Sequence, residues 1–273
     1  LFLIFEYCEY DLYSLLYIKK LDIKHIKSIM KQFLIVLQYC AGQKVIHRDL
    51  KPENMFITRN CTLKLGDFGL ARKVRDDRNT RYSTNVITLW YRPPEILCNN
   101  ESKGYNYKSE IDIWSAGCIL YEMVAGEQLF RAKENNVASQ LTKIASICGP
   151  IPPEISKLIG MPKNEKIPNK SQLDKFLKER FEHHPDFMPL IPVLLEMLKY
   201  QPSERISAEK ALNDPFFREI DSTYDPSNIP EIDIDDIHQR EVNETRSQKA
   251  RPSSQERLDE LRTEKTFPPV AIL

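Results

Sequence analysis

Two short stretches of the sequence decide the fold: His47-Arg48-Asp49-Leu50-Lys51-Pro52-Glu53-Asn54 and, further along the chain, Asp67-Phe68-Gly69. The first places an Asn five residues after an Asp, and an apolar segment with the pattern of a short strand separates it from the second. Either tripeptide alone, His-Arg-Asp or Asp-Phe-Gly, also occurs by chance in surface turns. Both motifs in this order, with the internal Asn, argue against a chance match. They predict one site where carboxylate and amide oxygens hold divalent cations beside a proton acceptor.

The two motifs are the signature of protein kinases, and the chain resembles the eukaryotic members of that family from residue 1 to about 220. Pro93-Pro94-Glu95 stands where the activation segment of a kinase closes. The resemblance implies a protein-kinase-like fold of the α+β class, mainly the helical C-terminal lobe with the last strand of the N-terminal lobe. The implied parts are that strand and the hinge (1–10) and the C-terminal lobe (11–220) with its activation segment (67–95). The acidic composition of residues 221–273, with Ser and Pro, predicts a flexible tail, and docking of the tail on the body is the alternative.

The resemblance also implies the roles of the catalytic residues. Asp49 is expected to accept the proton of the substrate hydroxyl, and Lys51 to reach the transferring phosphoryl group. The hydroxyl of Thr88 is expected to brace both of them, although a loop Thr without a role is the alternative. Asn54 and Asp67 are expected to hold the Mg²⁺ ions that bridge the phosphates. The expected cofactors are ATP and Mg²⁺.

The first residues of the chain resemble the hinge strand of a kinase. In that resemblance Phe5 is the gatekeeper, and Glu6 and Cys8 offer backbone groups to adenine. Asp11 would face the ribose, and Phe56 would form the floor of the adenine pocket. A Phe-Glu-Tyr strand taken alone is usually only part of a core, and its position upstream of His-Arg-Asp favours the hinge.

Residues 86–95, Val-Ile-Thr-Leu-Trp-Tyr-Arg-Pro-Pro-Glu, narrow the resemblance to cyclin-dependent kinases. Together with Cys8 and residues 147–154, they resemble the transcription-elongation branch, whose members phosphorylate the repeat tail of RNA polymerase II. A cell-cycle branch is the alternative. The implied partners are a cyclin, an upstream activating kinase and protein substrates. A nuclear location is favoured by the resemblance only, with a cytoplasmic one as the alternative.

The resemblance implies a preference for substrates with Pro after the acceptor Ser or Thr. Residues that match Ile87 and Arg92 shape a pocket for this Pro in the family, because the usual backbone acceptor there is already occupied. We therefore expect Ser-Pro and Thr-Pro sites as substrates.

Activation is expected to depend on a phosphate in the activation segment. A phosphoryl group carries a charge of about −1.5 to −2 and orders a segment by pairing with Arg side chains, here Arg48 and Arg72. Ser83 follows a Tyr as the acceptor Thr of the family does, and Thr84 fits equally if one residue is deleted before Val86. The acceptor is therefore Ser83 or Thr84, and a solvated pair without a role is the alternative.

Two further charged groups have implied structural roles. The carboxylate of Glu95 is expected to pair with Arg205 near the end of the domain. Asp112 is expected to brace the catalytic loop through the backbone near Arg48. Each could instead be an ordinary surface charge, but the motif contexts of Glu95 and Arg205 favour a buried pair.

Composition limits the other classes of function. The chain has 273 residues, with 39 Lys and Arg against 39 Asp and Glu, and residues 221–273 carry 12 acids and 7 bases. The slightly basic body is explained by a solvated surface, so no direct nucleic-acid partner is expected.

The six cysteines form no C-x-x-C pair, which argues against a zinc site. No apolar run is long enough to span a bilayer, so no membrane partner is expected.

Apolar spacing predicts a helix over 23–42, with Gly42 as a stop, and further helices are predicted over 134–148, 171–182, 188–199 and 207–212. Residues 111–125 are apolar nearly all round, which predicts a central buried helix. Residues 71–92 read as a long surface loop, and residues 1–5, Leu-Phe-Leu-Ile-Phe, as a buried strand.

No Gly-rich loop, strand Lys or helix Glu of a kinase N-terminal lobe is present, so we expect a fragment that is inactive alone. Two explanations stay open: a piece of an active kinase, or a product that works as a non-catalytic binding module.

Overall fold

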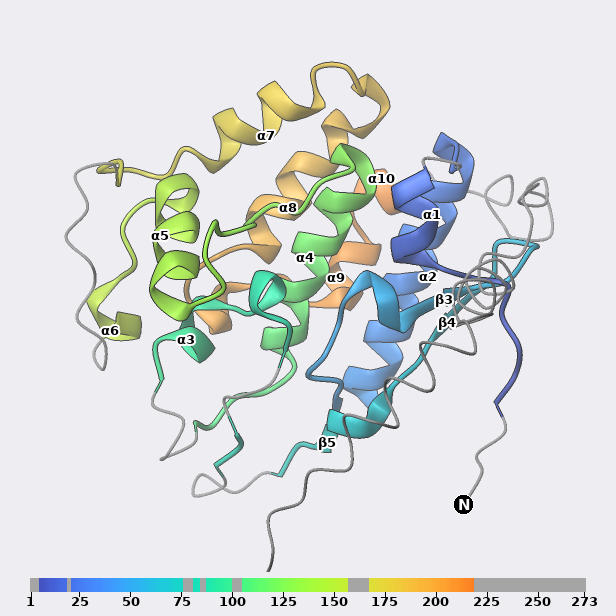
Figure 1. Ribbon diagram of the computed structural model, residues 1–273, viewed down its shortest axis with the longest axis horizontal. Coiled ribbons are helices and arrows are strands. Elements are labelled where there is room, and N and C mark those ends of the chain that lie inside the picture. The colour runs from blue at the N-terminus through green and yellow to red at the C-terminus, as the bar shows by residue number, and fades with distance from the viewer. Residues whose placement is uncertain are drawn as a thin grey trace, which may run out of the picture. The chain divides into compact units, whose positions relative to one another are not determined.

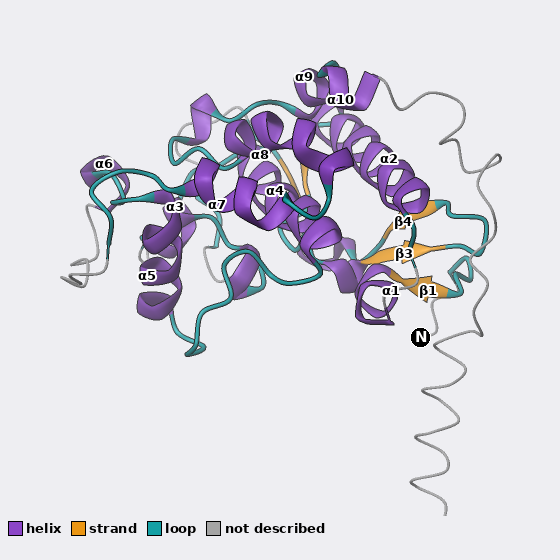
Figure 2. Cartoon of the chain, turned by 90° about the horizontal axis from the view of Figure 1, so that it is seen from above, coloured by secondary structure: helices purple, strands orange, loops and turns teal. Residues whose placement is uncertain are grey.

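The computed structural model describes residues 5–18, 21–75, 81–83, 87–99, 105–156 and 167–218. All of them belong to one compact unit, Leu1–Asp233. The unit is mainly helical, with short strands at one side (Figures 1 and 2). The predicted acidic tail, 221–273, lies outside the described residues.

The long helix α2, Ile23–Gly42, coincides with the predicted helix 23–42. It begins where the Asp22 side chain accepts hydrogen bonds from the backbone N–H groups of Lys24 and His25, and the His25 ring accepts in return from the N–H of Asp22. This reciprocal cap satisfies amides that would otherwise lack partners. The helix does end at Gly42, but the left-handed residue in the turn that follows is Lys44, with φ 56°.

The central helix α4, Glu110–Ala125, is buried along almost its whole length, with 14 of its 16 residues inside. The prediction of a buried helix over 111–125 is therefore confirmed. In Figure 1 this helix lies between α2 and α8, Ile191–Met197. The helix ends at Gly126, whose φ of 68° suits a residue without a Cβ. Asp112, the residue expected to brace the catalytic loop, lies at the start of α4. Because α4 is buried, it holds Asp112 in a fixed position.

The strands of the described residues form two small antiparallel sheets. The first has the order β1-β3-β4, from Tyr10–Asp11, Met55–Ile57 and Leu63–Leu65. The second pairs β2, Val45–Ile46, with β5, Arg72–Lys73. β3 and β4 lie in the region where short strands and loops were predicted, whereas β5 lies within residues 71–92, which were predicted as a loop; pairing with β2 makes this part of the segment a strand. The catalytic loop, residues 47–54, joins β2 to β3.

The remaining elements close the lobe around α4. Their bounds are α1, Leu12–Ile18; α3, Pro94–Leu97; α5, Val137–Cys148; α6, Pro153–Ser156; α7, Leu173–Phe181; α9, Ala208–Leu212; and α10, Pro215–Arg218. In the described ranges, short 3₁₀ turns lie at 52–54, 68–70, 89–91, 185–190 and 202–204. The predicted helix over 134–148 starts later because Asn136 caps α5, accepting from the N–H of Ser139. The predicted helix over 188–199 begins as a 3₁₀ turn that contains Pro189.

The prediction of a buried strand at the beginning of the chain is wrong at Phe5. Residues 1–4 of that strand lie outside the described residues, but Phe5 is 80% exposed, and the first strand among the described residues begins at Tyr10. An apolar side chain is buried only where another element covers it, and no described segment packs over Phe5. Tyr10, by contrast, pairs with Ile57 of β3 and is completely buried.

The six cysteines are free thiols, and all are buried. Burial raises the pKa of every one of them, to about 11 for Cys98 and about 12 for Cys148. No group of three or more His, Cys, Asp or Glu side chains within the described ranges is arranged to hold a metal ion.

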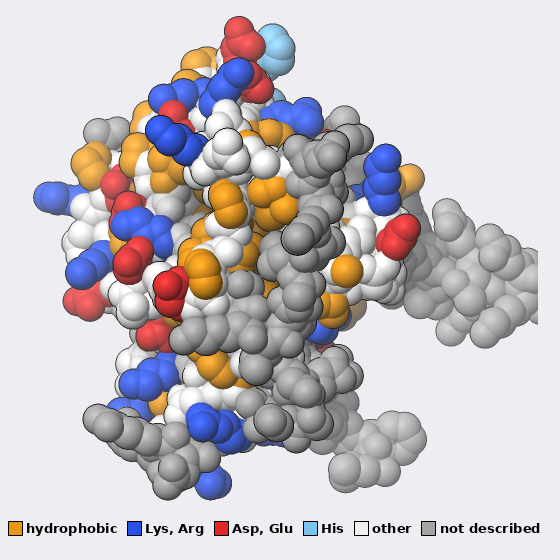
Figure 3. All heavy atoms as spheres, turned by 90° about the vertical axis from the view of Figure 1, so that its left-hand side faces the viewer, with side chains coloured by type: hydrophobic (Ala, Val, Ile, Leu, Met, Phe, Trp, Pro, Cys, Tyr) orange, Lys and Arg blue, Asp and Glu red, His pale blue; other side chains and the backbone are white. Residues whose placement is uncertain are grey.

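The surface carries both signs of charge. On the face shown in Figure 3, Lys and Arg side chains are interspersed with Asp and Glu, and hydrophobic side chains lie between them. In the part of the chain that the structure describes, no helix combines the length and the apolar character needed to cross a bilayer.

Candidate active site

The catalytic loop follows β2 directly and is held by Asp112 at the start of α4. Its carboxylate accepts from the backbone N–H of His47 at 2.7 Å and of Arg48 at 3.0 Å. Burial raises the pKa of Asp112 to about 6, against the effect of these two bonds. Arg48 has φ 70°, a conformation that costs a non-glycine residue about 1–2 kcal/mol. The two bonds from successive amides therefore hold a strained backbone immediately before Asp49.

Three side chains surround the carboxylate of Asp49. Lys51 Nζ lies 3.3 Å from Oδ2, and the hydroxyl of Thr88 donates to Oδ1 at 3.4 Å. The amide nitrogen of Asn54 donates to the backbone oxygen of Asp49 at 2.8 Å and to Oδ2 at 3.2 Å. Asp49 is 8% exposed, so a narrow part of its surface faces outward. The structure thus brings together Asp49, Lys51, Asn54 and Thr88, although the recorded bond of Thr88 reaches Asp49 and not Lys51.

The second motif is tied to the first through His47. The ring nitrogen Nε2 of His47 lies 2.9 Å from the carbonyl oxygen of Gly66. The rings of His47 and Phe68 pack edge to face, with 4.7 Å between their centroids. Between Gly66 and Phe68 in the sequence, Asp67 adopts φ 54° and accepts from the N–H of Gly69 at 3.3 Å. Asp67 is exposed, so its carboxylate is accessible.

The donor set at this site fits a divalent cation bound together with phosphates. Asn54 uses its amide nitrogen in the bonds to Asp49, and its Oδ1 has no recorded partner among the described residues. Asp67 adds an accessible carboxylate. Two oxygen ligands are too few for a cation held by protein alone, but Mg²⁺ commonly takes one or two protein ligands and completes its shell with substrate phosphates and water.

The residues expected to bind the nucleotide are only partly brought together. Asp11 and Phe56 are direct neighbours across β1 and β3. The carboxylate of Asp11, however, accepts from the N–H and the hydroxyl of Ser14, at 2.8 and 2.9 Å, at the start of α1. Cys8 is buried, whereas Glu6 is exposed and lies 3.2 Å from Lys64.

The backbone at Ile87 is strained and its carbonyl oxygen is occupied. Ile87 has φ 66°, which is unusual for a β-branched residue. Its carbonyl oxygen accepts from Nε and Nη2 of Arg92, at 3.2 and 2.9 Å. These two bonds to one guanidinium hold the strained carbonyl in place.

Arg48 binds the activation segment, while Arg72, itself part of that segment, has no recorded bond to Ser83 among the described residues. Nε of Arg48 donates to the carbonyl oxygen of Leu70 at 2.6 Å, and Nη1 donates to the hydroxyl of Tyr107 at 2.8 Å. The exposed Arg72 donates to the neighbouring carbonyl of Ala71. Ser83 is exposed, and Thr84 lies outside the described residues.

Glu95 and Arg205 form a buried pair, with side-chain exposures of 2% and 0%. Nη1 and Nη2 of Arg205 each reach a carboxylate oxygen at 2.7 Å. The other N–H groups donate to the carbonyl oxygens of Lys199, Tyr200 and Glu110. All five guanidinium donors are therefore used, which is the condition under which a buried charge is tolerated.

A further buried carboxylate was not predicted from the sequence. Glu122 of α4 accepts from the hydroxyl of Tyr91 and from the side-chain amide of Gln128, both at 2.8 Å. Burial raises the pKa of Glu122 to about 7, although both hydrogen bonds act to lower it. The bond to Tyr91 ties the end of the activation segment to the central helix.

Comparison with known proteins identifies the family of the chain. The family profile described as Protein kinase domain matches residues 1–217. The chain belongs to this family. The predicted kinase fold is thereby confirmed.

Relatives of this kinase chain include transcription-type cyclin-dependent kinases, which confirms the predicted resemblance. It is 40% identical over 233 residues to cyclin-dependent kinase 12 of Drosophila melanogaster, covering 84% of this chain and 19% of the relative. It is 38% identical over 241 residues to cyclin-dependent kinase C-1 of Oryza sativa, covering 85% and 44%, and 36% identical over 231 residues to cyclin-dependent kinase 9-A of Xenopus laevis, covering 80% and 58%. The kinase chain thus spans between about one fifth and three fifths of these relatives.

A solved structure is similar as well. The kinase chain matches a chain of the yeast RNA Pol II CTD kinase CTDK-1 complex with a TM-score of 0.67 and 30% sequence identity, over 78% of this chain and 69% of that one.

Sequence reasoning about this kinase missed Tyr107 and Glu122. The only signal for Tyr107 was its place in a run of aromatic residues, Tyr105-Asn106-Tyr107. Glu122 stood out only as a carboxylate inside an otherwise apolar helix, which is a sign that a partner is buried with it.

Proposed function

We propose that the protein containing this chain is a cyclin-dependent Ser/Thr kinase that transfers the γ-phosphoryl group of ATP to a protein hydroxyl. The observation that carries the proposal is the environment of Asp49. Its carboxylate is fixed by Asn54 and Thr88, with Lys51 at 3.3 Å. A carboxylate in this position accepts the hydroxyl proton as the oxygen–phosphorus bond forms and the bond to ADP breaks.

Each neighbour of Asp49 contributes a distinct function in this proposal. Lys51 supplies a positive charge near the transferred group, and Thr88 fixes the orientation of the carboxylate. Asn54 and Asp67 are the side chains that would hold Mg²⁺, which when bound neutralises the charge that develops on the phosphates. Asp11 and Phe56, paired across β1 and β3, are the described residues on the nucleotide side, with Phe5, Glu6 and Cys8 preceding them.

The substrate class is proposed from the backbone at Ile87. Its carbonyl oxygen already accepts two hydrogen bonds from Arg92. A substrate residue with an N–H at this point would bury a donor without an acceptor, at a cost of about 1–3 kcal/mol. Pro has no N–H and avoids that cost. Ser-Pro and Thr-Pro sites are therefore the proposed substrates, and the repeat tail of RNA polymerase II is one such substrate.

Regulation is proposed by analogy with the relatives. A cyclin is the proposed partner, and an upstream kinase is proposed to phosphorylate Ser83 or Thr84, with Arg48 and Arg72 as the side chains that bind the phosphate. The name of the yeast CTDK-1 complex and the cyclin-dependent kinase relatives support action on transcription in the nucleus.

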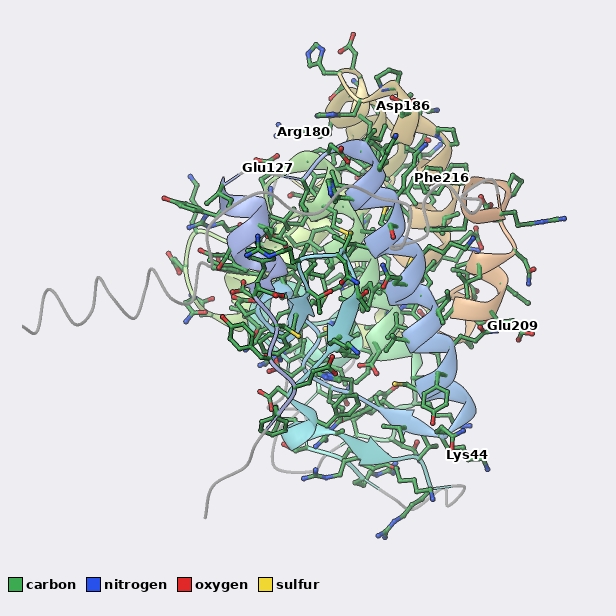
Figure 4. All side chains as sticks on the ribbon, turned by 90° about the vertical axis from the view of Figure 1, so that its right-hand side faces the viewer. Lys44, Glu127, Arg180, Asp186, Glu209 and Phe216 are labelled. Atoms are coloured by element: carbon green, nitrogen blue, oxygen red, sulfur yellow. The ribbon has the colours of Figure 1, made fainter. Side chains whose placement is uncertain are left out.

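The test of the proposal is Asp49→Asn in the full-length protein with its cyclin. Loss of the proton acceptor is expected to lower kcat by about 10²–10⁴-fold. Asp186→Asn, an exposed carboxylate labelled in Figure 4, is the matched control and is expected to leave kcat unchanged. Phosphorylation by Asp49→Asn at the wild-type rate would refute the role of Asp49. No phosphoryl transfer by the wild-type protein with its cyclin would instead favour a non-catalytic binding module.

A second test addresses the substrate class. Arg92→Ala frees the carbonyl oxygen of Ile87, which then becomes available to a substrate N–H. The preference for a Ser-Pro over a Ser-Ala peptide, measured as a ratio of kcat/KM, is expected to fall about tenfold, the factor that corresponds to ~1.4 kcal/mol. An unchanged ratio would show that the occupied carbonyl does not set the preference.

A further inference from the structure

A buried tyrosine joins the catalytic loop to the activation segment. Nη1 of Arg48 donates to the hydroxyl oxygen of Tyr107 at 2.8 Å, and the same hydroxyl donates to the backbone carbonyl oxygen of Ser83 at 2.7 Å. Tyr107 is 5% exposed, so water competes little for these bonds. The three groups form one continuous line of hydrogen bonds from a guanidinium to the backbone of the segment.

The hydroxyl is suited to this position by its chemistry. A guanidinium only donates and a carbonyl only accepts, whereas a hydroxyl accepts from one and donates to the other. The positive charge of Arg48 polarises the hydroxyl of Tyr107, which strengthens the bond to the carbonyl of Ser83. A Phe at this position would keep the ring and lose both bonds.

The neighbouring aromatic side chains fix the ring of Tyr107. It lies 5.2 Å from the ring of Tyr82 and 6.5 Å from that of Tyr105. Tyr82 and Tyr105 exchange both backbone hydrogen bonds at 3.0 Å. The hydroxyl of Tyr82 accepts from the N–H of Arg75 at 3.1 Å and donates to the carbonyl of Lys73 at 3.3 Å. The tyrosines thus fasten the segment both at Ser83 and near its beginning.

Arg48 connects the anchored activation segment to Asp49 in the active site. Its backbone N–H is bound by Asp112, its Nε by the carbonyl of Leu70, and it immediately precedes Asp49. Among the described residues, Nη2 of Arg48 has no recorded hydrogen-bond partner. The guanidinium is therefore held at the segment by Tyr107 and keeps a donor for a further acceptor.

We propose that Tyr107 is a positioning residue that anchors the activation segment to Arg48 before the segment is phosphorylated. The proposal rests on the proposed function, in which Arg48 binds a phosphoryl group on Ser83 or Thr84. Before modification the Tyr107 hydroxyl is the acceptor for Nη1. A phosphoryl group, with a charge of about −1.5 to −2 and three acceptor oxygens, is a stronger partner, so the Tyr107 hydroxyl becomes dispensable once the group is present.

The experiment compares Tyr107→Phe with wild type in the full-length protein with its cyclin, in unphosphorylated and phosphorylated forms. Unphosphorylated Tyr107→Phe is expected to lose about tenfold in kcat with little change in the KM for ATP, and phosphorylation is expected to restore kcat to within about twofold of wild type. Tyr105→Phe is the matched control, because it removes a hydroxyl of the same cluster that has no recorded bond among the described residues.

Amide hydrogen exchange provides a readout that does not need turnover. The amides of Tyr82 and Tyr105 bond to each other's carbonyl groups, so their protection reports whether the segment is seated. Exchange is expected to accelerate about tenfold in unphosphorylated Tyr107→Phe and to return to the wild-type rate on phosphorylation.

Two results would overturn the proposal: unphosphorylated Tyr107→Phe that behaves as wild type, or a loss that phosphorylation does not repair. The second would indicate a merely structural residue. Failure of the proposed regulation is a separate result, seen if the double variant Ser83→Ala, Thr84→Ala takes up no less phosphate than wild type and keeps full activity. The comparison of unphosphorylated Tyr107→Phe with wild type would still decide whether the hydroxyl anchors the segment.

Discussion

Replacing Glu122 by Gln is expected to remove a pH dependence of folding stability that the wild-type chain carries. Glu122 is 3% exposed, and burial raises its pKa from 4.5 to about 7. Between these two values the folded state keeps the proton and the unfolded state has released it. Rising pH therefore favours unfolding: the stabilisation is complete below about pH 4.5 and is lost as the pH rises through about 7.

The size of the effect follows from the shift in pKa. One pKa unit corresponds to 1.36 kcal/mol, so the shift of Glu122 from 4.5 to about 7 corresponds to about 3 kcal/mol. Gln is neutral at every pH and has nearly the same shape. The free energy of unfolding of Glu122→Gln minus that of wild type is therefore expected to rise by about 3 kcal/mol between about pH 4.5 and 7.5.

Urea unfolding followed by tryptophan fluorescence over that pH range measures this difference. Trp114 is fully buried, so its emission changes on unfolding. Taking the difference between variant and wild type cancels the titration of other groups, including Asp112. Glu127→Gln, which removes a half-exposed carboxylate next to Arg180 (Figure 4), is the matched control for the loss of a charge. A difference that does not change with pH, or that falls as the pH rises, would refute the assignment of a buried proton to Glu122.

Two further variants test other contacts. Arg205→Ala leaves a buried carboxylate unpaired and is expected to lower the free energy of unfolding by about 3–5 kcal/mol, whereas Arg180→Ala, in an exposed pair, is expected to lower it by less than about 1 kcal/mol; equal effects in denaturant unfolding would contradict this. Gly66→Ala places a Cβ 2.5 Å from Cε2 of Phe56 and is expected to cost about 1–3 kcal/mol. Adding Phe56→Leu should recover part of this loss in the thermal midpoint, and no recovery would show that the ring is not the obstacle.

The main helices could be predicted because their own residues carry the signal. The apolar spacing of α2 and the nearly continuous apolar run of α4 are local patterns, and both helices lie where the patterns placed them. The observed helix boundaries differ from the predicted ones in two places. At α5 the side chain of Asn136 caps the helix, and near Pro189 the predicted helix begins as a 3₁₀ turn. Such contacts depend on single side chains and leave little trace in periodicity.

The site residues that could be predicted are those that lie within sequence motifs. Asp49 and Asn54 lie in one motif, and the structure joins them by hydrogen bonds. Glu95 and Arg205 are 110 residues apart, and only the resemblance suggested that they pair. No motif contains Tyr107 or Glu122, because the folded chain, and not the local sequence, brings their partners to them. Phe5 shows the opposite error, since its apolar character predicted burial without an element to cover it.

The six buried thiols can report local opening of the folded chain. The thiolate of a cysteine is the group that attacks a thiol reagent, and burial suppresses both access and ionisation, so each cysteine reacts only when its surroundings open. Cys40 lies on α2, Cys118 on α4, Cys148 at the end of α5, and Cys8 in the segment before β1. Labelling kinetics resolved by peptide mass spectrometry would rank these regions by their opening free energies without introducing a foreign group into the fold.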